Sequence, residues 1–312
     1  MSKKALVTDY VHPSLLTGLE QRGYEVVYDR GITLEEVKQV ILEYEGIIIN
    51  SKIKMEATTM DTAPNLKWIG RLGSGLEIID LEHAAKKNIV VINTPEGNRN
   101  AVAEHAIGML LTLANNLKRG DSEVRDKVWR REENRGWELK GKTLGIIGLG
   151  HTGSKLAKKM SAWELDIISY DKYKPDTSDT IPYVRRVAQE DILKHADIIS
   201  LHLPLSPETH HLVDDVFLQK CKKNVVLINT SRGAVVDTKA LVSALESGHV
   251  KGACLDVFEN EKPNTYSEAE SNTYNNLFAF GNVVLSPHVA GWTSESLERI
   301  AKVMLTKLDN YL

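Results

Sequence analysis

The sequence predicts an α/β protein built from two doubly wound parallel sheets. Short β-branched runs alternate with helix-like segments twice along the chain, a cluster of breaker residues divides the two series, and a glycine-rich turn follows the first strand of the second series. The chain has 312 residues, and chains of about 300 residues usually fold as two domains.

The first series of strands lies in the first hundred residues. Helix-like pieces separate the strands, and one of them begins at Thr33, where Glu36 three residues later fits a capping box. Short apolar strands joined by helical crossovers are typical of a parallel sheet covered on both faces. The predicted strands cover residues 4–8, 24–28, 46–50, 68–72 and 89–93. The breaker cluster TPEGN at 94–98 is predicted to be a linker.

The second series follows a long apolar segment, 101–117, whose apolar residues cover most of a helix circumference. We expect this helix to be buried between domains or subunits. The order of the strands after it suits a doubly wound dinucleotide-binding sheet. These strands cover residues 144–148, 166–170, 197–201, 225–229, 252–257 and 283–286. The polar stretch 260–276 is expected to be a long loop, and 294–312 one amphipathic helix.

Composition excludes several classes of function. Lys and Arg number 39 against 42 Asp and Glu, and this net charge of −3 leaves no basic field for nucleic acid. The two cysteines, Cys221 and Cys254, make no disulfide framework, and without a Cys-x-x-Cys pair we expect no bound metal. Polar residues interrupt the most apolar segment, and the N-terminus lacks a signal-peptide pattern. We therefore expect a cytoplasmic protein that binds neither nucleic acid nor membrane.

The most informative local pattern is LGIIGLGHTG, a strand that runs into Gly-x-Gly-x-x-Gly and then into a helix. Gly148 permits the tight turn, Gly150 lets the backbone approach a pyrophosphate, and Gly153 lets the helix pack on the strand. Asp171 ends the next strand, 18 residues after Gly153, near the spacing of about 20 expected for a ribose-binding acid. A carboxylate there favours NAD over NADP, and the neighbouring Lys172 weakens that preference a little.

A second glycine motif, GWELKGKT at 136–143, satisfies the P-loop pattern letter for letter. A phosphate cradle needs a strand before it, a helix after it and small residues between them. Here a charged stretch without a strand precedes the motif and a strand follows it. Trp137 and Glu138 are also unsuited to a polyphosphate, so we reject this motif.

Three groups of polar residues lie where loops leave the carboxyl ends of the second sheet, the edge at which open α/β sheets bind ligands. Arg232, in NTSRG, suits a carboxylate held by two hydrogen bonds. The loop DVFENE at 256–261 offers three acids, one of which is able to orient a histidine. His288, in SPHVAG, follows a third strand and belongs to the residue type that exchanges protons near neutral pH.

Together these segments resemble the D-isomer-specific 2-hydroxyacid dehydrogenases. The matching segments, in the family's order, are LGSGLEIID, NTPEGNRNAVAEHAIGMLL, LGIIGLGHTG, SLHLPLSPETHHLV, INTSRGAVVD, LDVFENE and SPHVAG. The resemblance implies that Arg232 holds the substrate carboxylate, that His288 is the acid and base, and that Glu261 rather than Glu259 supports the histidine. It also implies NAD as cofactor and a D-2-hydroxy acid as substrate, with 3-phosphoglycerate as a candidate.

The resemblance further implies the domain plan and the remaining contacts. A Rossmann coenzyme domain, 98–287, is inserted into a flavodoxin-like substrate domain made of 1–97 and 288–312. Coenzyme contacts carried over by position are Gly148, Gly150, His151, Thr152, Gly153, Asp171, Pro204, Thr209, Thr230 and Asp256. Substrate contacts carried over are Lys52, Gly73, Ser74, Gly75 and Arg232. Family members form a two-fold dimer through the apolar helix, so a homodimer is expected.

The sequence departs from the family in places that matter for the substrate. The loop NSKIK lacks the Arg-Ser-Arg run of many phosphoglycerate-specific members, although Lys52 and Lys54 remain available to a phosphate. The chain ends 24 residues after His288, so no separate serine-sensing domain is expected. Trp292 either walls the substrate pocket or packs the hinge.

Two other functions fit the same fold. One is an NAD(H)-sensing binding protein like the transcriptional corepressors of this fold, which keep the three catalytic residues. The other is a formate-type dehydrogenase, in which a neutral glutamine is expected in place of Glu261.

Overall fold

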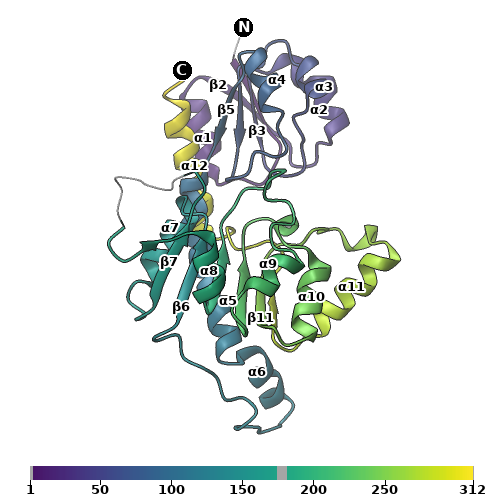
Figure 1. Ribbon diagram of the computed structural model, residues 1–312. Helices are drawn as coiled ribbons and strands as arrows, with labels where there is room; N and C mark the ends of the chain where they lie inside the picture. Colours follow the sequence, from purple (N-terminus) through teal and green to yellow (C-terminus); the bar gives the residue numbers. More distant parts are fainter. Residues whose placement is uncertain (1–2, 174–180, 312) are drawn as a thin grey trace. The chain divides into compact units, whose positions relative to one another are not determined.

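The computed structural model describes residues 3–173 and 181–311 (Figure 1). The chain divides into two compact units, Met1–Arg99 with Trp292–Leu312, and Asn100–Gly291. The sequence placed the domain boundaries at 97/98 and 287/288, and the roles assigned to the two domains stay predictions. None of the described helices is long and apolar enough to cross a membrane.

The first unit contains a parallel sheet of five strands among its described residues, with helices on both faces. The strands are β1 Lys3–Val7, β2 Tyr24–Tyr28, β3 Gly46–Ile49, β4 Trp68–Arg71 and β5 Val90–Asn93. Their order, β2-β1-β3-β4-β5, is the flavodoxin-like order that the family resemblance implies. The helices are α1 Pro13–Gln21, α2 Leu34–Val40, α3 Ala57–Asp61, α4 Leu81–Lys86 and α12 Ser294–Leu308, with a 3-10 turn at Ile41–Glu43.

Apolar side chains from the helices cover both faces of this sheet. Leu15 of α1 and Met304 of α12 are buried in one cluster, and Met60 of α3 is buried in the other. The predicted capping box of α2 is confirmed, since Thr33 Oγ1 accepts from the amide of Glu36 and a carboxylate oxygen of Glu36 accepts from the amide of Thr33. The C-terminal helix belongs to this unit although 192 residues of the other unit precede it.

The second unit contains a parallel sheet of seven strands among its described residues. The strands are β6 Thr143–Ile147, β7 Asp166–Tyr170, β8 Arg185–Arg186, β9 Ile198–Leu201, β10 Val225–Asn229, β11 Val250–Leu255 and β12 Val283–Leu285. Their order is β12-β11-β10-β9-β6-β7-β8, in which β6 and β9 are neighbours and the direction of winding reverses. This reversal is the switch point at which doubly wound sheets bind ligands. The six predicted strands are therefore confirmed, and the two-residue β8 was not predicted.

Seven helices of the described residues accompany this sheet (Figure 1). They are α5 Pro95–Ala114, α6 Leu117–Arg125, α7 His151–Met160, α8 Gln189–His195, α9 Asp215–Lys220, α10 Thr238–Glu246 and α11 Glu268–Ala279, with 3-10 turns at Gly233–Val235 and Pro263–Thr265. Ala103, Ala106 and Leu110 of α5 are buried in the cluster that also holds residues of β6 and α7. One face of the long apolar helix thus packs on its own sheet.

Two predictions about irregular segments were wrong. The predicted linker 94–98 is instead the start of α5, which begins at Pro95. Proline suits the first turn of a helix because the amide it lacks has no partner there. The predicted loop 260–276 contains most of α11, whose capping box joins Ser267 to Glu270. Tyr274 is buried on the inner side of α11, and this burial stabilises a helix whose composition is mostly polar.

Candidate active site

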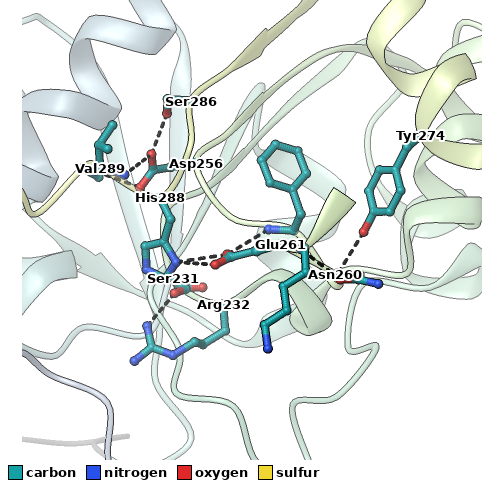
Figure 2. Close-up of polar contacts among 12 residues, drawn as sticks. Ser231, Arg232, Asp256, Asn260, Glu261, Tyr274, Ser286, His288 and Val289 are labelled. Carbon is teal, nitrogen blue, oxygen red and sulfur yellow. Dashed lines mark hydrogen bonds and ion pairs between the residues drawn. The ribbon is translucent and has the colours of Figure 1, made fainter. Parts of the chain in front are cut away.

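Arg232, Glu261 and His288 come from loops that leave three neighbouring strands of the second unit. Arg232 follows β10, Glu261 follows β11 and His288 follows β12, and these strands pair in parallel. Their carboxyl ends therefore lie at one edge of the sheet. Figure 2 shows the three side chains close to one another. Three residues separated by up to 56 positions are thus brought together within one unit.

Within this group, the His288 ring contacts the carboxylate of Glu261 directly. Nδ1 of His288 lies 2.8 and 3.0 Å from the two carboxylate oxygens of Glu261 (Figure 2). Burial favours the neutral form of Glu261, but the contact and charge of His288, the amide of Phe258 and the charge of Arg232 together hold its pKa below the usual value. Glu261 is therefore an ionised carboxylate against the ring.

The structure distinguishes Glu261 from the other acids of the 256–261 loop. Glu259 lies 2.6 Å from Nε2 of His211, and its other oxygen accepts from the amide of Thr238 at 2.9 Å, at the start of α10. Glu259 therefore stabilises a helix terminus and a neighbouring loop. The choice of Glu261, which the family resemblance implied, agrees with this geometry.

Asp256 holds the turn that carries His288. Its carboxylate is buried, and it accepts from Ser286 Oγ at 2.6 Å and from the amides of Val289 and Ala290, both at 2.9 Å (Figure 2). The amide of His288 donates to the carbonyl oxygen of Asp256 at 2.7 Å, and His288 has a φ of 55°. The left-handed turn is thus fixed on both sides of the histidine. A coenzyme contact of Asp256 stays a prediction.

The glycine turn between β6 and α7 has the three properties predicted for a pyrophosphate site. Gly148 has a φ of 92°, and a Cβ at Gly153 would lie 2.1 Å from the carbonyl oxygen of Gly148. A Cβ at Gly150 meets no atom within 4 Å, so this position is open. His151 and Thr152 are the first residues of α7, and the positive end of the helix dipole there suits an anion.

Asp171 lies where the ribose of a dinucleotide is expected. It follows β7, and its carboxylate accepts from the amide of Leu149 at 2.8 Å, inside the glycine turn. The neighbouring Lys172 forms an ion pair of 2.9 Å with Glu208, which also accepts from the hydroxyl of Tyr173 at 2.6 Å. Glu208 was not singled out from the sequence. It offsets the lysine charge next to Asp171.

An internal hydrogen bond closes the loop after β9, which lies next to the glycine turn. Thr209 Oγ1 donates to the carbonyl oxygen of Pro204 at 2.7 Å. A Cβ at Gly148 would lie 2.3 Å from the carbonyl oxygen of His202, so the two segments touch. Burial lowers the pKa of His202 to about 4, and its Nε2 lies 2.9 Å from Ser200 Oγ. His202 is therefore a neutral ring at the ligand-binding edge, and the sequence motifs did not indicate it.

Residues 107–290 match the family described as D-isomer specific 2-hydroxyacid dehydrogenase, NAD binding domain. The chain belongs to this family. It is 34% identical to D-3-phosphoglycerate dehydrogenase of Archaeoglobus fulgidus over 307 residues, which are 98% of this chain and 57% of that protein. It thus spans little more than half the length of this relative. Glyoxylate reductase of Thermofilum pendens is 39% identical over 281 residues, 88% of this chain and 80% of that protein.

A solved structure of the same family resembles the whole chain. The crystal structure of D-lactate dehydrogenase from Aquifex aeolicus complexed with NAD and lactic acid superposes with a TM-score of 0.84 at 29% identity, covering 99% of this chain and 95% of that chain. The match agrees with the predicted fold class of two α/β units with parallel sheets. The NAD-binding domain of the family accounts for the second unit.

The residues present fit NAD. The glycine turn offers room at Gly150 for a pyrophosphate, and Asp171 offers a carboxylate for ribose hydroxyls. Thr230, predicted at the nicotinamide end, has a buried hydroxyl oxygen without a hydrogen-bond partner among the described residues. Buried hydroxyls are normally paired, so a ligand group next to Thr230 would satisfy it.

The predicted substrate residues of the first unit are partly engaged with their own unit. Lys52 Nζ donates to the carbonyl oxygen of Arg30 at 2.7 Å, and the amide of Gly73 donates to Thr94 Oγ1 at 2.8 Å. The amides of Ser74 and Gly75 donate to no other described residue. They are the groups of this loop that remain open to a carboxylate.

One cationic and one aromatic residue, Arg71 and Trp292, complete this description of the first unit. Arg71 ends β4 beside the Gly73–Gly75 loop, and its Nη1 donates to the carbonyl oxygen of Leu72 at 2.5 Å. The sequence motifs did not single it out. The ring of Trp292 lies 6.4 Å from that of Tyr10, so Trp292 packs within the first unit.

Proposed function

We propose that this chain catalyses NAD-dependent hydride transfer between a D-2-hydroxy acid and the corresponding 2-oxo acid. The observation that carries the proposal is the contact of His288 Nδ1 with the ionised Glu261, beside Arg232. These residues lie at the carboxyl edge of the seven-stranded sheet, the same edge as the glycine turn. A bound NAD would accept or return the hydride at its nicotinamide ring. All other steps fall to side chains of this chain.

His288 exchanges the hydroxyl proton in this proposal. Its Nδ1 is occupied by Glu261, so Nε2 is the ring nitrogen that meets the substrate hydroxyl. In oxidation Nε2 takes the proton as the C2–H bond breaks, and in reduction the protonated ring returns it to the forming alkoxide. The ionised Glu261 stabilises the protonated ring and holds its orientation.

Arg232 binds the substrate carboxylate. Its guanidinium presents paired N–H donors that match a carboxylate, and its charge polarises the neighbouring carbonyl oxygen of a 2-oxo acid. Holding the carboxylate fixes which face of C2 meets the nicotinamide ring. The family resemblance also assigns substrate contacts to Ser74 and Gly75 of the first unit.

The finer assignment of the substrate is 3-phosphoglycerate. The support is the similarity to D-3-phosphoglycerate dehydrogenases, with Lys52 and Lys54 as cations for the phosphate. Similarity to a glyoxylate reductase and to the hydroxypyruvate reductase of Thermotoga maritima supports smaller 2-oxo acids as rivals. The proposal includes a homodimer formed through α5.

The test follows NADH absorbance with phosphohydroxypyruvate, glyoxylate, hydroxypyruvate and pyruvate as substrates. We expect turnover with at least one of them. His288→Ala should keep NADH binding, measured by fluorescence, and lose at least about 100-fold in kcat. His195→Ala, an exposed histidine at the end of α8, is the matched control and should behave as wild type.

Two outcomes would overturn the proposal. Full activity of His288→Ala would remove the histidine from the reaction. NADH binding without turnover on any of the four acids would favour the NAD(H)-sensing binding protein instead. Sedimentation of the purified chain as a monomer would contradict the dimer alone.

A further inference from the structure

A basic pocket lies in the second unit, at the amino-terminal edge of its sheet. Its volume is about 480 Å³. The charged and aromatic residues that line it are Trp137, Lys142, Asp197, Lys222, Lys223 and Lys251. The loops just before β6, β9 and β10 supply Lys142, Asp197, Lys222 and Lys223, and Lys251 is the second residue of β11. The glycine turn follows β6, so the pocket and the predicted coenzyme site lie at opposite edges of the sheet.

The acid in the lining of this pocket, Asp197, already has hydrogen-bond partners in the chain. Asp197 accepts from Lys222 Nζ at 2.7 Å and from the amide of Thr143 at 2.9 Å. Burial favours its neutral form, but these two hydrogen bonds and the charges of Lys222 and Lys142 hold the pKa of Asp197 below its usual value. The carboxylate is therefore ionised and offsets Lys222. The lining holds four lysines against this one acid, so its net formal charge is +3.

Two of these lysines converge. Lys251 Nζ lies 4.4 Å from the centroid of the Trp137 ring. The pKa of Lys251 is lowered, first by loss of hydration and then by the positive charge of Lys142, and the negative charge of Asp197 reverses only part of this effect. Two cations thus lie close enough to repel each other across a space that holds no second acid in its lining. An anion between them would replace this repulsion by attraction.

Lysines at this edge of a sheet often have a purely structural role, because the helix C-termini that lie there carry partial negative charge. That role explains Lys222, which follows α9. It does not explain Lys142, which lies in the loop before β6, or Lys251, which belongs to a strand. These two lysines are the reason to look for a ligand.

We propose that the basic pocket binds a small multivalent anion, a phosphate or a polycarboxylate, between Lys142, Lys223 and Lys251. The volume accommodates a metabolite-sized anion, and the ring of Trp137 packs against Lys251 in its lining. The site is independent of the hydride-transfer chemistry. It gives the coenzyme domain a second ligand, a phosphate or a carboxylate.

The test is isothermal titration calorimetry of the full chain with inorganic phosphate and, separately, citrate. Sodium chloride keeps the ionic strength constant, and saturating NADH fills the predicted coenzyme site. We expect saturable binding of at least one anion, and the anion that binds more tightly identifies the class. The double variant Lys142→Gln/Lys251→Gln should weaken binding at least about tenfold. Anion binding should also change the tryptophan fluorescence of the chain. Trp137→Phe should keep binding and lose that change.

The matched control is Lys118→Gln/Lys158→Gln, which removes the same charge from exposed positions outside the pocket. This control should bind as wild type, and both double variants should unfold at the wild-type temperature within a few degrees. The proposal is wrong if neither anion binds saturably at constant ionic strength. It is equally wrong if the two double variants lose the same affinity, because the effect would then be one of net charge.

Discussion

The hydroxyl of Ser286 donates a hydrogen bond of 2.6 Å to the buried carboxylate of Asp256. On its other side the same oxygen lies 2.8 Å from Nε2 of His105, a residue of α5. Asp256 in turn accepts from the two amides that follow His288. The position of the proposed acid and base thus depends on a side chain that does not touch it.

Ser286→Ala should therefore affect both stability and turnover. Loss of a hydrogen bond to a buried charge is expected to lower the free energy of unfolding by about 1.5–3 kcal/mol, measured by denaturant unfolding. kcat should fall while the Kd of NADH stays near the wild-type value, because the turn that carries His288 loosens and the glycine turn does not. Ser243→Ala, at an exposed position of α10, is the control. If the two variants are indistinguishable, Ser286 does not support the turn.

Two glycines of the same turn should respond in opposite ways. Gly153→Ala places a Cβ 2.1 Å from the carbonyl oxygen of Gly148, so we expect a large loss of thermal stability or failure to fold. Gly150→Ala meets no atom within 4 Å and should fold, yet its methyl group lies where a pyrophosphate is predicted. Its NADH affinity, measured by fluorescence titration, should fall at least about tenfold. Wild-type affinity in Gly150→Ala would place the coenzyme elsewhere.

Glu208 is expected to reinforce the preference for NAD. In Glu208→Gln the charge of Lys172 is no longer offset, so it attracts a 2′-phosphate; the ratio of kcat/KM for NADPH to that for NADH should rise about tenfold. Asp171→Ala should also raise this ratio, because it removes the carboxylate that repels the phosphate. The double variant Lys172→Gln/Glu208→Gln should return toward wild type, and Glu246→Gln is an exposed control. A ratio that moves in none of these variants would contradict the ribose role of the Asp171 region.

His202 should make stability depend on pH. Its pKa is about 4 in the folded chain against an ordinary value of 6.5. Between these values the unfolded chain binds a proton that the folded chain does not, so the free energy of unfolding falls as pH decreases from 6.5 to 4. The loss approaches about 3 kcal/mol, at roughly 1.4 kcal/mol per pKa unit.

The variant His202→Asn isolates this contribution. Asparagine has no proton to gain in this range and keeps a polar group for Ser200. The difference between the pH profiles of wild type and variant should therefore grow from pH 6.5 to pH 4, the two pKa values that define the window. His195→Asn, which changes an exposed histidine, should follow the wild-type profile. Parallel profiles for wild type and His202→Asn would show that the pKa of the ring is the same in the folded and the unfolded chain.

The sheets were predictable from the sequence because their signal is local. Buried parallel strands consist of continuous apolar runs, and the alternation of these runs with helices fixes the fold class. The two errors arose where composition opposes context. Pro95 and Gly97 are breakers in most settings, yet Pro95 begins α5, and α11 is polar but capped by Ser267.

The site was predictable only in part. Arg232 and His288 have local motifs that the family resemblance interprets, whereas Glu261 and Glu259 were told apart by family position and not by chemistry. Glu208 and His202 have no motif of their own. Their importance arises when the ends of β6, β7 and β9 meet, and this meeting is a property of the sheet order.

The backbone of His288 has a consequence for directed evolution of this protein. With a φ of 55°, the residue occupies a conformation that glycine and asparagine adopt at lower free energy. Libraries screened for heat resistance alone should therefore enrich those two residues at position 288. The most heat-stable variants from such a screen would lack the proposed acid and base and would therefore have lost their activity.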